Sequence, residues 1–190
     1  MAIAFRFHPQ RTIEAAAMFL KLHGKPMKYI GLLKMLYIAD RMFLEKVDRP
    51  ITGDRAYSME YGPVLSGVYD LIKGNNVHSA LPLWQEFITT RGSDRDRYIS
   101  LIKEPENNYL SKSAQKTIQE VYDKFGHLDP FEIVEWTHDL PEWKKPTESS
   151  RSSPIFFDDV LNFIGRTSEE IEEVKLLEAR EAYLDRFLAA

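Results

Sequence analysis

The segment MEYGPVLSGVYD, residues 59–70, decides the fold because its hydrophobic period changes within two residues. Around its start, the large side chains Tyr57, Met59 and Tyr61 alternate with polar ones, which is typical of a short strand with one buried face. The residues that follow, 63–74, have the spacing of an amphipathic helix. The segment therefore predicts a strand joined directly to a helix.

The two residues at this junction explain how the switch is made. Gly62 can leave the strand with a positive φ, which other residues rarely adopt. Pro63 has a preset φ and lacks an N–H, so it suits the first position of a helix, and Gly74 supplies a helix stop. We therefore predict a helix that begins at Pro63, with Tyr61 at the junction.

Upstream of the junction, residues 28–46 read KYIGLLKMLYIADRMFLEK and carry apolar side chains on more than one helical face. A band this wide indicates a central helix with little exposed surface. Glycine in an exposed helix costs about 1 kcal/mol relative to alanine, so Gly31 predicts either a close helix contact or a late helix start.

Asp40 lies within this apolar helix, where an unpaired carboxylate is costly. We expect it to bond to a partner such as Arg41, Tyr57 or Tyr61, or to lie at the exposed margin of the helix. A structural hydrogen bond is the simpler interpretation, and a functional site is the alternative.

The rest of the chain divides into further helices, one hairpin and one loop. Apolar spacing, N-cap residues and terminal glycines or prolines predict helices over residues 9–24, 111–126, 129–141, 155–165 and 167–190. Two β-prone runs in residues 84–103 predict a hairpin around RGSDR, and the Ser-rich segment 144–153 predicts a polar loop. The fold class is α+β, a predominantly helical single domain over residues 1–190 with a small hairpin or sheet.

The last of these helices is acidic and amphipathic. Thr167 or Ser168 begins it with acidic residues in the first turn, and apolar residues recur on one face through residue 188. This helix either packs on its own domain or is left free for a partner.

Composition narrows the range of functions. The chain has 190 residues, is 44% hydrophobic and carries a formal net charge of −4, so we expect no general attraction to nucleic acid or to anionic membranes. The absence of cysteine excludes a disulfide scaffold, a thiolate zinc site and a cysteine nucleophile. Neither a secretory leader nor a membrane-spanning run is recognisable, so we expect a cytoplasmic protein.

Motifs for enzymatic chemistry are missing from the sequence. There is no dinucleotide-binding glycine motif, P-loop, nucleophile elbow or HExxH pair. Glu135 and His138 have the helical spacing of carboxylate-bridged metal sites, but such sites need this pattern on two helices. We therefore expect no cofactor and no metal, with His138 and Trp136 packing a helix end or His138 hydrogen-bonded to a nearby backbone group. A metal-dependent enzyme that uses Asp40, Glu135 and His138 is the less favoured alternative.

Two features are compatible with anion or DNA binding. The helix predicted to begin at Pro63 offers free N–H groups, although most helix starts bind only water. The hairpin tip resembles the wing of a DNA-binding domain, with acidic residues that offset part of its charge: Arg91, Asp94, Arg95, Asp96 and Arg97. A solvated hairpin is the favoured interpretation, and a DNA-binding transcriptional regulator is the first alternative function.

Residues 32–74 resemble the core signature of the Panacea domain, the SocA-like antitoxin family that is also described as phage-associated. The similarity continues through WTHDLPEW (136–143) and PIFFDDVLNFIGRTSEEIEE (154–173). One small departure is Phe157 before the acidic pair, where the family pattern favours a tyrosine-like residue. The positions that match the pattern are Leu36, Tyr37, Asp40, Arg41, Ile51, Thr52, Gly53, Tyr61, Gly62, Pro63, Val64, His138 and Trp143.

This resemblance implies a non-enzymatic antitoxin that neutralises a cognate toxin by direct, stoichiometric binding. Some relatives are thought to hand the toxin to a protease as adaptors, so a protease is a further partner that the resemblance implies. The family pattern and the enrichment of aromatic residues with arginine at binding hot spots define the partner-binding candidates. These are Asp40, Arg41, Tyr57, Tyr61, Gly62, Pro63, Val64, His138 and Trp143.

Overall fold

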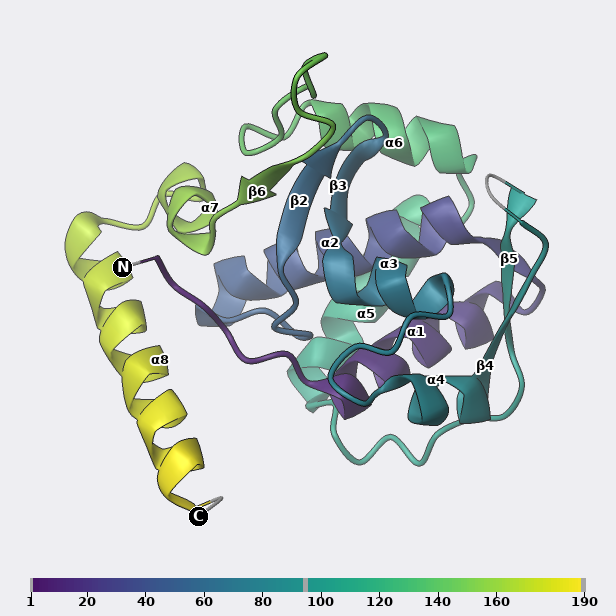
Figure 1. Ribbon diagram of the computed structural model, residues 1–190, viewed down its shortest axis with the longest axis horizontal. Helices are drawn as coiled ribbons and strands as arrows, with labels where there is room; N and C mark the ends of the chain where they lie inside the picture. The colour runs from purple at the N-terminus through teal and green to yellow at the C-terminus, as the bar shows by residue number, and fades with distance from the viewer. Residues whose placement is uncertain (1, 94–95, 189–190) are drawn as a thin grey trace.

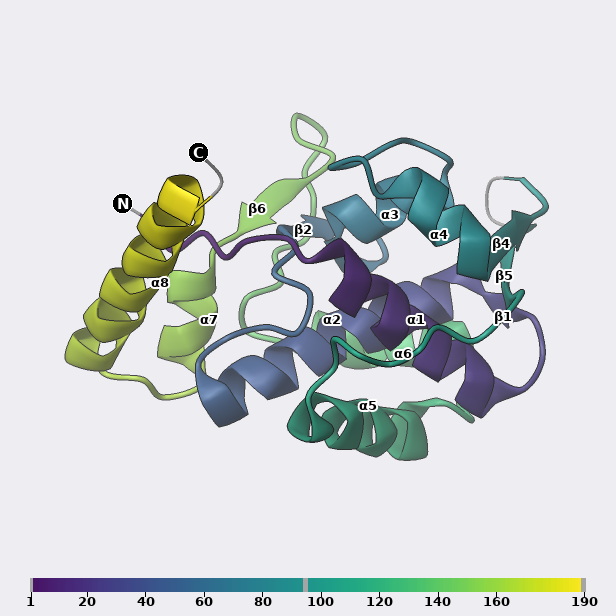
Figure 2. The same ribbon diagram turned by 90° about the horizontal axis from the view of Figure 1, so that it is seen from below.

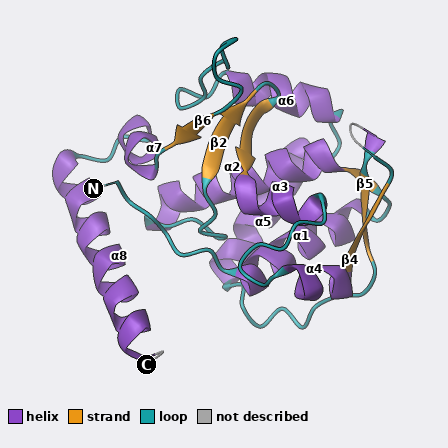
Figure 3. Ribbon diagram, in the orientation of Figure 1, coloured by secondary structure: helices purple, strands orange, loops and turns teal. Residues whose placement is uncertain are grey.

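The structure is a computed structural model that describes residues 2–93 and 96–188 (Figure 1). Its helices are α1 (Pro9–His23), α2 (Tyr29–Val47), α3 (Ser66–Ile72), α4 (Leu81–Phe87), α5 (Lys112–Phe125), α6 (Pro130–His138), α7 (Phe157–Phe163) and α8 (Ser168–Leu188). Its strands are β1 (Met27–Lys28), β2 (Ala56–Met59), β3 (Gly62–Leu65), β4 (Ile88–Arg91), β5 (Tyr98–Leu101) and β6 (Ser153–Ile155). The predicted α+β class with mostly helical content is confirmed (Figure 3).

Two small antiparallel sheets flank the helices. One has the strand order β1–β5–β4 and the other β3–β2–β6. In the second sheet Tyr57 of the central strand stands opposite Val64 on one side and Pro154 on the other. The strand before the Gly62 turn is therefore the middle strand of a sheet and not one arm of an isolated hairpin.

Helix α2 forms the centre of the molecule. Every residue from 29 to 40 is buried, and α1, α5, α6 and β3 pack around it (Figure 1 and Figure 2). Gly31 faces Pro130, the first residue of α6, but an added Cβ would lie at an ordinary contact distance of 3.6 Å from Cγ of that proline, so the packing there does not require glycine. The prediction of a central, buried helix is confirmed.

The helix predicted to begin at Pro63 begins at Ser66 instead. Gly62 has the expected positive φ, 81°, but residues 62–65 continue as β3 and pair with β2. The local pattern was misleading because proline is compatible both with a helix start and with an edge strand. On an edge strand the missing N–H of proline can face solvent, so the sheet loses no hydrogen bond. The possibility of anion binding at a helix start on Pro63 therefore loses its premise, because the helix begins at Ser66.

Buried Asp54 determines where α3 begins. Its carboxylate accepts hydrogen bonds from the backbone N–H groups of Gly67 at 3.0 Å and Val68 at 2.9 Å, so it caps the helix from a separate loop. Burial raises the pKa of Asp54, and the backbone donors oppose that rise. Glycine is needed next to this cap because a Cβ on residue 67 would lie 2.9 Å from Asp54 Oδ1.

Two further boundaries differ from the predictions. Residues 153–155 are a strand, so the helix expected over 155–165 is α7 and begins at Phe157. Residues 153–155 pair with the edge of β2 that faces away from β3, so tertiary pairing overrides local helix spacing there. Trp84, expected in the first β-prone run, lies in α4 with an exposed fraction of 1%.

The remaining predicted elements are confirmed, except that α6 ends at His138, before the predicted end at residue 141. Helix α1 ends at Gly24 with a φ of 69°, and Ser111 caps α5 by accepting from the N–H of Ala114. The hairpin of β4 and β5 is formed, with Thr90 opposite Ile99. Within its predicted charged tip, Asp94 and Arg95 lie outside the described residues.

Helix α8 lies along one side of the molecule, beside α7 (Figure 1). Thr167 and Glu170 form a capping box at its start, in which Thr167 Oγ1 accepts at 3.2 Å and Glu170 Oε2 accepts at 2.7 Å. Ile171 and Val174 contact the core cluster. The acidic helix therefore packs on its own domain through its first half.

In the part of the chain that the structure describes, no helix is both long and apolar enough to cross a membrane.

Candidate binding groove

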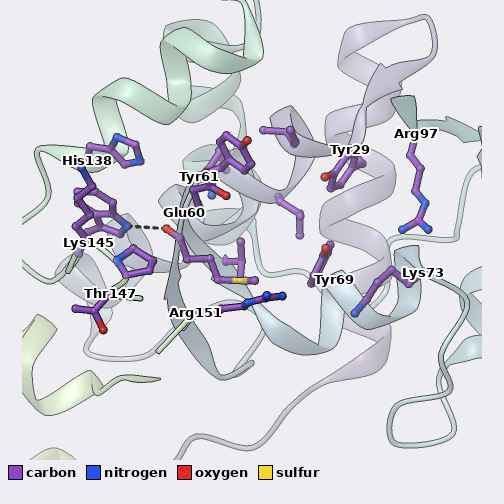
Figure 4. Close-up of a pocket in the computed structure, with 17 residues that line it drawn as sticks. Tyr29, Glu60, Tyr61, Tyr69, Lys73, Arg97, His138, Lys145, Thr147 and Arg151 are labelled. Carbon is purple, nitrogen blue, oxygen red and sulfur yellow. Dashed lines mark hydrogen bonds between the residues drawn. The ribbon is translucent and has the colours of Figure 1, made fainter. Parts of the chain in front are cut away.

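A groove of about 960 Å³ opens between α2, the β2–β3 turn, α3 and the segment 143–151 (Figure 4). Its cationic lining residues are Lys34, Lys73, Arg97, Lys145 and Arg151. Its aromatic lining residues are Tyr29, Tyr61, Tyr69, His138 and Trp143. Among the described lining residues only Glu60 is acidic, so the groove is basic although the chain as a whole is acidic.

Lys34 of α2 is the buried cation of the groove, with an exposed fraction of 1%. Its ammonium donates a hydrogen bond to the carbonyl oxygen of Pro63 at 2.6 Å. Burial lowers the pKa of Lys34 to about 7, because the charged form is poorly solvated there.

The Gly62 turn makes this lysine possible. A Cβ on residue 62 would overlap Thr137 Oγ1 and would lie 3.3 Å from Lys34 Nζ. The absence of that Cβ lets β3, α6 and the lysine ammonium converge, and the turn then aims the Pro63 carbonyl at Lys34. Here the abrupt turn serves to position a buried cation.

Helix α6 supplies one wall of the groove. Asp129 and Glu132 form a capping box at its start, as the predicted N-cap at Asp129 requires. At its other end His138 stacks on Trp143, with ring centroids 3.9 Å apart and planes 17° from parallel. Trp143 is fixed in turn by its indole N–H, which donates to the carbonyl oxygen of Met59 at 3.0 Å.

Tyrosines cover much of the remaining wall. Tyr61 contacts Phe131 edge to face at 6.1 Å, and Tyr29 stacks with Tyr69 at 6.3 Å. The ammonium of Lys73 lies 4.2 Å from the centre of the Tyr69 ring. These rings give the groove large apolar faces with polar atoms at their edges, a combination enriched at binding sites.

The structure brings some of the sequence candidates together at this groove. Tyr61, Val64, His138 and Trp143 line it, while Gly62 and Pro63 shape it through Lys34. The other three candidates, Asp40, Arg41 and Tyr57, do not line it.

Asp40 has a different set of partners from the three that were predicted. Its carboxylate accepts from the N–H groups of Ile51 at 3.0 Å and Thr52 at 2.9 Å, and from the Thr52 hydroxyl. The exposed fraction of Asp40 is 3%, so it does not lie at an exposed margin either. Burial raises its pKa to about 7, against the effect of the hydrogen bonds from Thr52.

Arg41 joins a second buried network. Its Nε and the hydroxyl of Tyr37 both donate to Glu142 Oε1, at 2.7 and 2.9 Å. Burial, followed by the Glu142 charge, raises the pKa of Tyr37 well above its usual range. This network ties α2 to the segment after α6, while Tyr57 packs half-buried on β2. Asp40 and Arg41 therefore have structural contacts that explain their presence.

The alternative metal site finds no support in side-chain placement. Glu135 is exposed on α6, and no group of three or more His, Asp or Glu side chains among residues 2–93 and 96–188 could hold a metal ion.

Sequence reasoning missed the cations of the groove. Lys34 carried a local signal, because it is a lysine within an unbroken apolar helix and must either reach the surface or find a buried acceptor. Lys73, Arg97, Lys145 and Arg151 come from separate segments, so no pattern in the sequence connects them.

Comparison with known proteins gives a family assignment. The family model described as antitoxin SocA-like, Panacea domain, matches residues 32–144, more than half of the chain and most of the groove. Searches of curated proteins and of solved structures find no significant match. The chain therefore belongs to the family described as antitoxin SocA-like, Panacea domain.

Proposed function

We propose that this protein is an antitoxin that neutralises a cognate toxin by direct, stoichiometric binding in the cytoplasm. Its membership of the SocA-like family is the observation that carries the proposal. The groove supports it, because aromatic rings and arginines around a recess are the combination that dominates binding energy at protein interfaces.

We further propose that the protein acts without catalysing a reaction. Three buried carboxylates make structural contacts: Asp40 accepts from the 51–52 turn, Asp54 caps α3, and Oε1 of Glu142 accepts from Tyr37 and Arg41. Hydrogen bonding of this kind accounts for their burial without a substrate.

The experiment uses the protein encoded by the adjacent reading frame. Expressed alone it should arrest growth, and co-expression with this chain should restore growth and yield a complex that co-purifies in a fixed ratio. A harmless neighbour, or rescue without any complex, would contradict the proposal.

Toxin abundance separates the two neutralising mechanisms. Neutralisation by binding predicts that the toxin persists in the complex during co-expression. An adaptor that delivers the toxin to a protease predicts instead that the toxin disappears, and that it reappears when the protease is absent.

A further inference from the structure

The charge of the groove is opposite to the charge of the chain. Five cations line it and one described lining residue, Glu60, is acidic, whereas the chain has a formal net charge of −4. Basic side chains gathered in a recess of an acidic protein create a local potential that favours an anionic ligand.

Lys34 has unused donor capacity within this recess. An ammonium group carries three donors, and Pro63 accepts one of them. No carboxylate among the described residues forms an ion pair with Lys34. Burial lowers its pKa to about 7, so an arriving carboxylate would also restore its full positive charge.

The other cations lie at the two sides of the groove. Lys145 is on the side of His138, and Lys73 and Arg97 are on the opposite side, with Arg151 between them in this view (Figure 4). Lys73 is paired with Asp70 at 2.9 Å. Arg97, Lys145 and Arg151 form no ion pair with any acidic side chain in the described part of the chain.

The lining between these cations suits a polypeptide better than a nucleic acid. Ile30, Leu33, Met59 and Val64 contribute apolar surface, which the apolar side chains of a polypeptide segment can cover. His138 Nε2 is also buried here without a hydrogen-bond partner among the described residues. A segment with alternating apolar and acidic side chains satisfies all of these groups.

We propose that the groove receives an acidic segment of the partner protein, with one carboxylate bound to Lys34 and others bound to Lys145, Arg151 and Arg97. This inference rests on the proposed antitoxin function and specifies the chemistry of the bound toxin segment. Apolar side chains of the same segment pack on Tyr61 and Tyr69.

The first test reverses charge at the exposed rim. The double variant Lys145→Glu with Arg151→Glu changes two exposed residues of the groove. The matched control, Lys112→Glu with Lys116→Glu, makes the same charge change on exposed positions of α5 outside the groove. With the protein of the adjacent reading frame as the probe, we expect the Kd to rise about tenfold or more in the groove variant only.

The second test examines the buried cation. Lys34→Met keeps a similar side-chain volume and removes the buried charge, although it leaves the Pro63 carbonyl oxygen without its donor. We expect a folded protein, checked by circular dichroism, with a Kd at least about tenfold higher. Unchanged affinity in both Lys34→Met and the rim variant would overturn the inference even though the complex forms.

The third test identifies the bound segment. A photo-crosslinking residue in place of Tyr69 should capture a partner segment that contains Asp or Glu, and Lys substitutions in that segment should restore binding to the rim variant. Capture of a neutral or basic segment would overturn the inference. So would tight binding of a 20-nucleotide single-stranded DNA that the rim variant loses, since it would assign the groove to nucleic acid.

These outcomes separate the two proposals. If the neighbouring protein fails to bind the wild-type chain at all, the antitoxin function is wrong and the inference falls with it. If it binds and every groove variant binds equally well, only the acidic-segment inference is wrong.

Discussion

Helices α2 and α8 are the two longest in the structure, with 19 and 21 residues. They differ in where their charged side chains lie, since α2 buries two of them and α8 leaves most of its own exposed. In α2 every residue from 29 to 40 is buried, and the charged groups within that stretch, Lys34 and Asp40, have uncharged hydrogen-bond partners. Among the described side chains of α8 only that of Val174 is buried.

The second half of α8 is held by ion pairs near the surface. Arg49 pairs with Glu178 at 3.3 Å and Glu181 at 2.9 Å, and Arg6 pairs with Asp185. Large apolar side chains from the middle of α8 to its end remain exposed: Leu176, Leu177, Tyr183, Leu184 and Phe187.

This contrast teaches that the same residue types make the two regions sensitive to different conditions. Buried charges in α2 couple stability to pH, because burial shifts their pKa values. Exposed pairs on α8 couple its docking to ionic strength, because salt screens them. The groove is lined by residues of the buried helix α2, so we expect its geometry to be more rigid than the docking of α8.

The largest expected effect is the pH dependence that Asp40 imposes. Its pKa is about 7 when folded and 3.8 ordinarily, so the folded state binds the proton more tightly. Wild-type stability should therefore fall as pH rises from about 4 to about 7, by up to about 4 kcal/mol relative to Asp40→Asn. Urea unfolding of both proteins across this pH range measures the difference.

Asn is the suitable replacement because it can accept from the backbone N–H groups of residues 51 and 52 and donate to the Thr52 hydroxyl, as the protonated acid does. A stability difference between the two proteins that stays constant between pH 4 and 8 would show that the carboxylate is ionised throughout.

The next largest effect is expected at the Gly62 turn. Gly62→Ala should lower the free energy of unfolding by about 3 kcal/mol, because it combines a positive φ with overlap of Thr137. Gly165→Ala, before α8, has a φ of 93° and open space around it, so it should cost only the backbone strain, about 1–2 kcal/mol. Equal losses, measured by urea denaturation, would mean that the turn is not tightly packed.

Removing a helix cap should change stability less than these substitutions, and the effect should differ between α6, which packs on α2, and α8. Asp129→Ala should lower global stability by about 1 kcal/mol, because α6 is packed on α2. Thr167→Ala removes the corresponding cap of α8 and should increase fraying there without moving the global unfolding midpoint. Thermal unfolding together with hydrogen exchange of α8 distinguishes these outcomes, and a shared shift in midpoint would argue that α8 unfolds with the core.

The smallest effect is expected from the ion pairs of α8. Arg49→Gln should weaken docking by about 0.5 kcal/mol and speed hydrogen exchange over residues 176–187 at low salt. At about 1 M salt the wild type should exchange as fast as the variant, because the pairs are screened. Arg180→Gln is the matched control, since Arg180 is exposed on α8 and forms no ion pair with the described residues. Exchange that is insensitive to both salt and Arg49 would assign α8 docking to apolar contacts alone.

Local chemistry accounts for what could be predicted from the sequence. The broad apolar band of α2, the cap of α6 at Asp129 and the positive φ at Gly62 each depend on residues close together in the chain, so their patterns are readable there. The groove residues Tyr61, Val64, His138 and Trp143 were candidates because they match the pattern of the family that the sequence resembles, and local chemistry alone did not single them out as a site.

Tertiary structure decided the rest, because the decisive partners are distant in the chain. Asp54 caps a helix that begins twelve residues later, residues 153–155 pair with β2 as a strand, and Thr52 donates hydrogen bonds to the carboxylate of Asp40. The sequence by itself determined the helical core and the turn. The basic character of the groove arises only when folding gathers cations from separate segments around Lys34, since electrostatic potential depends on distance in space and not on separation along the chain.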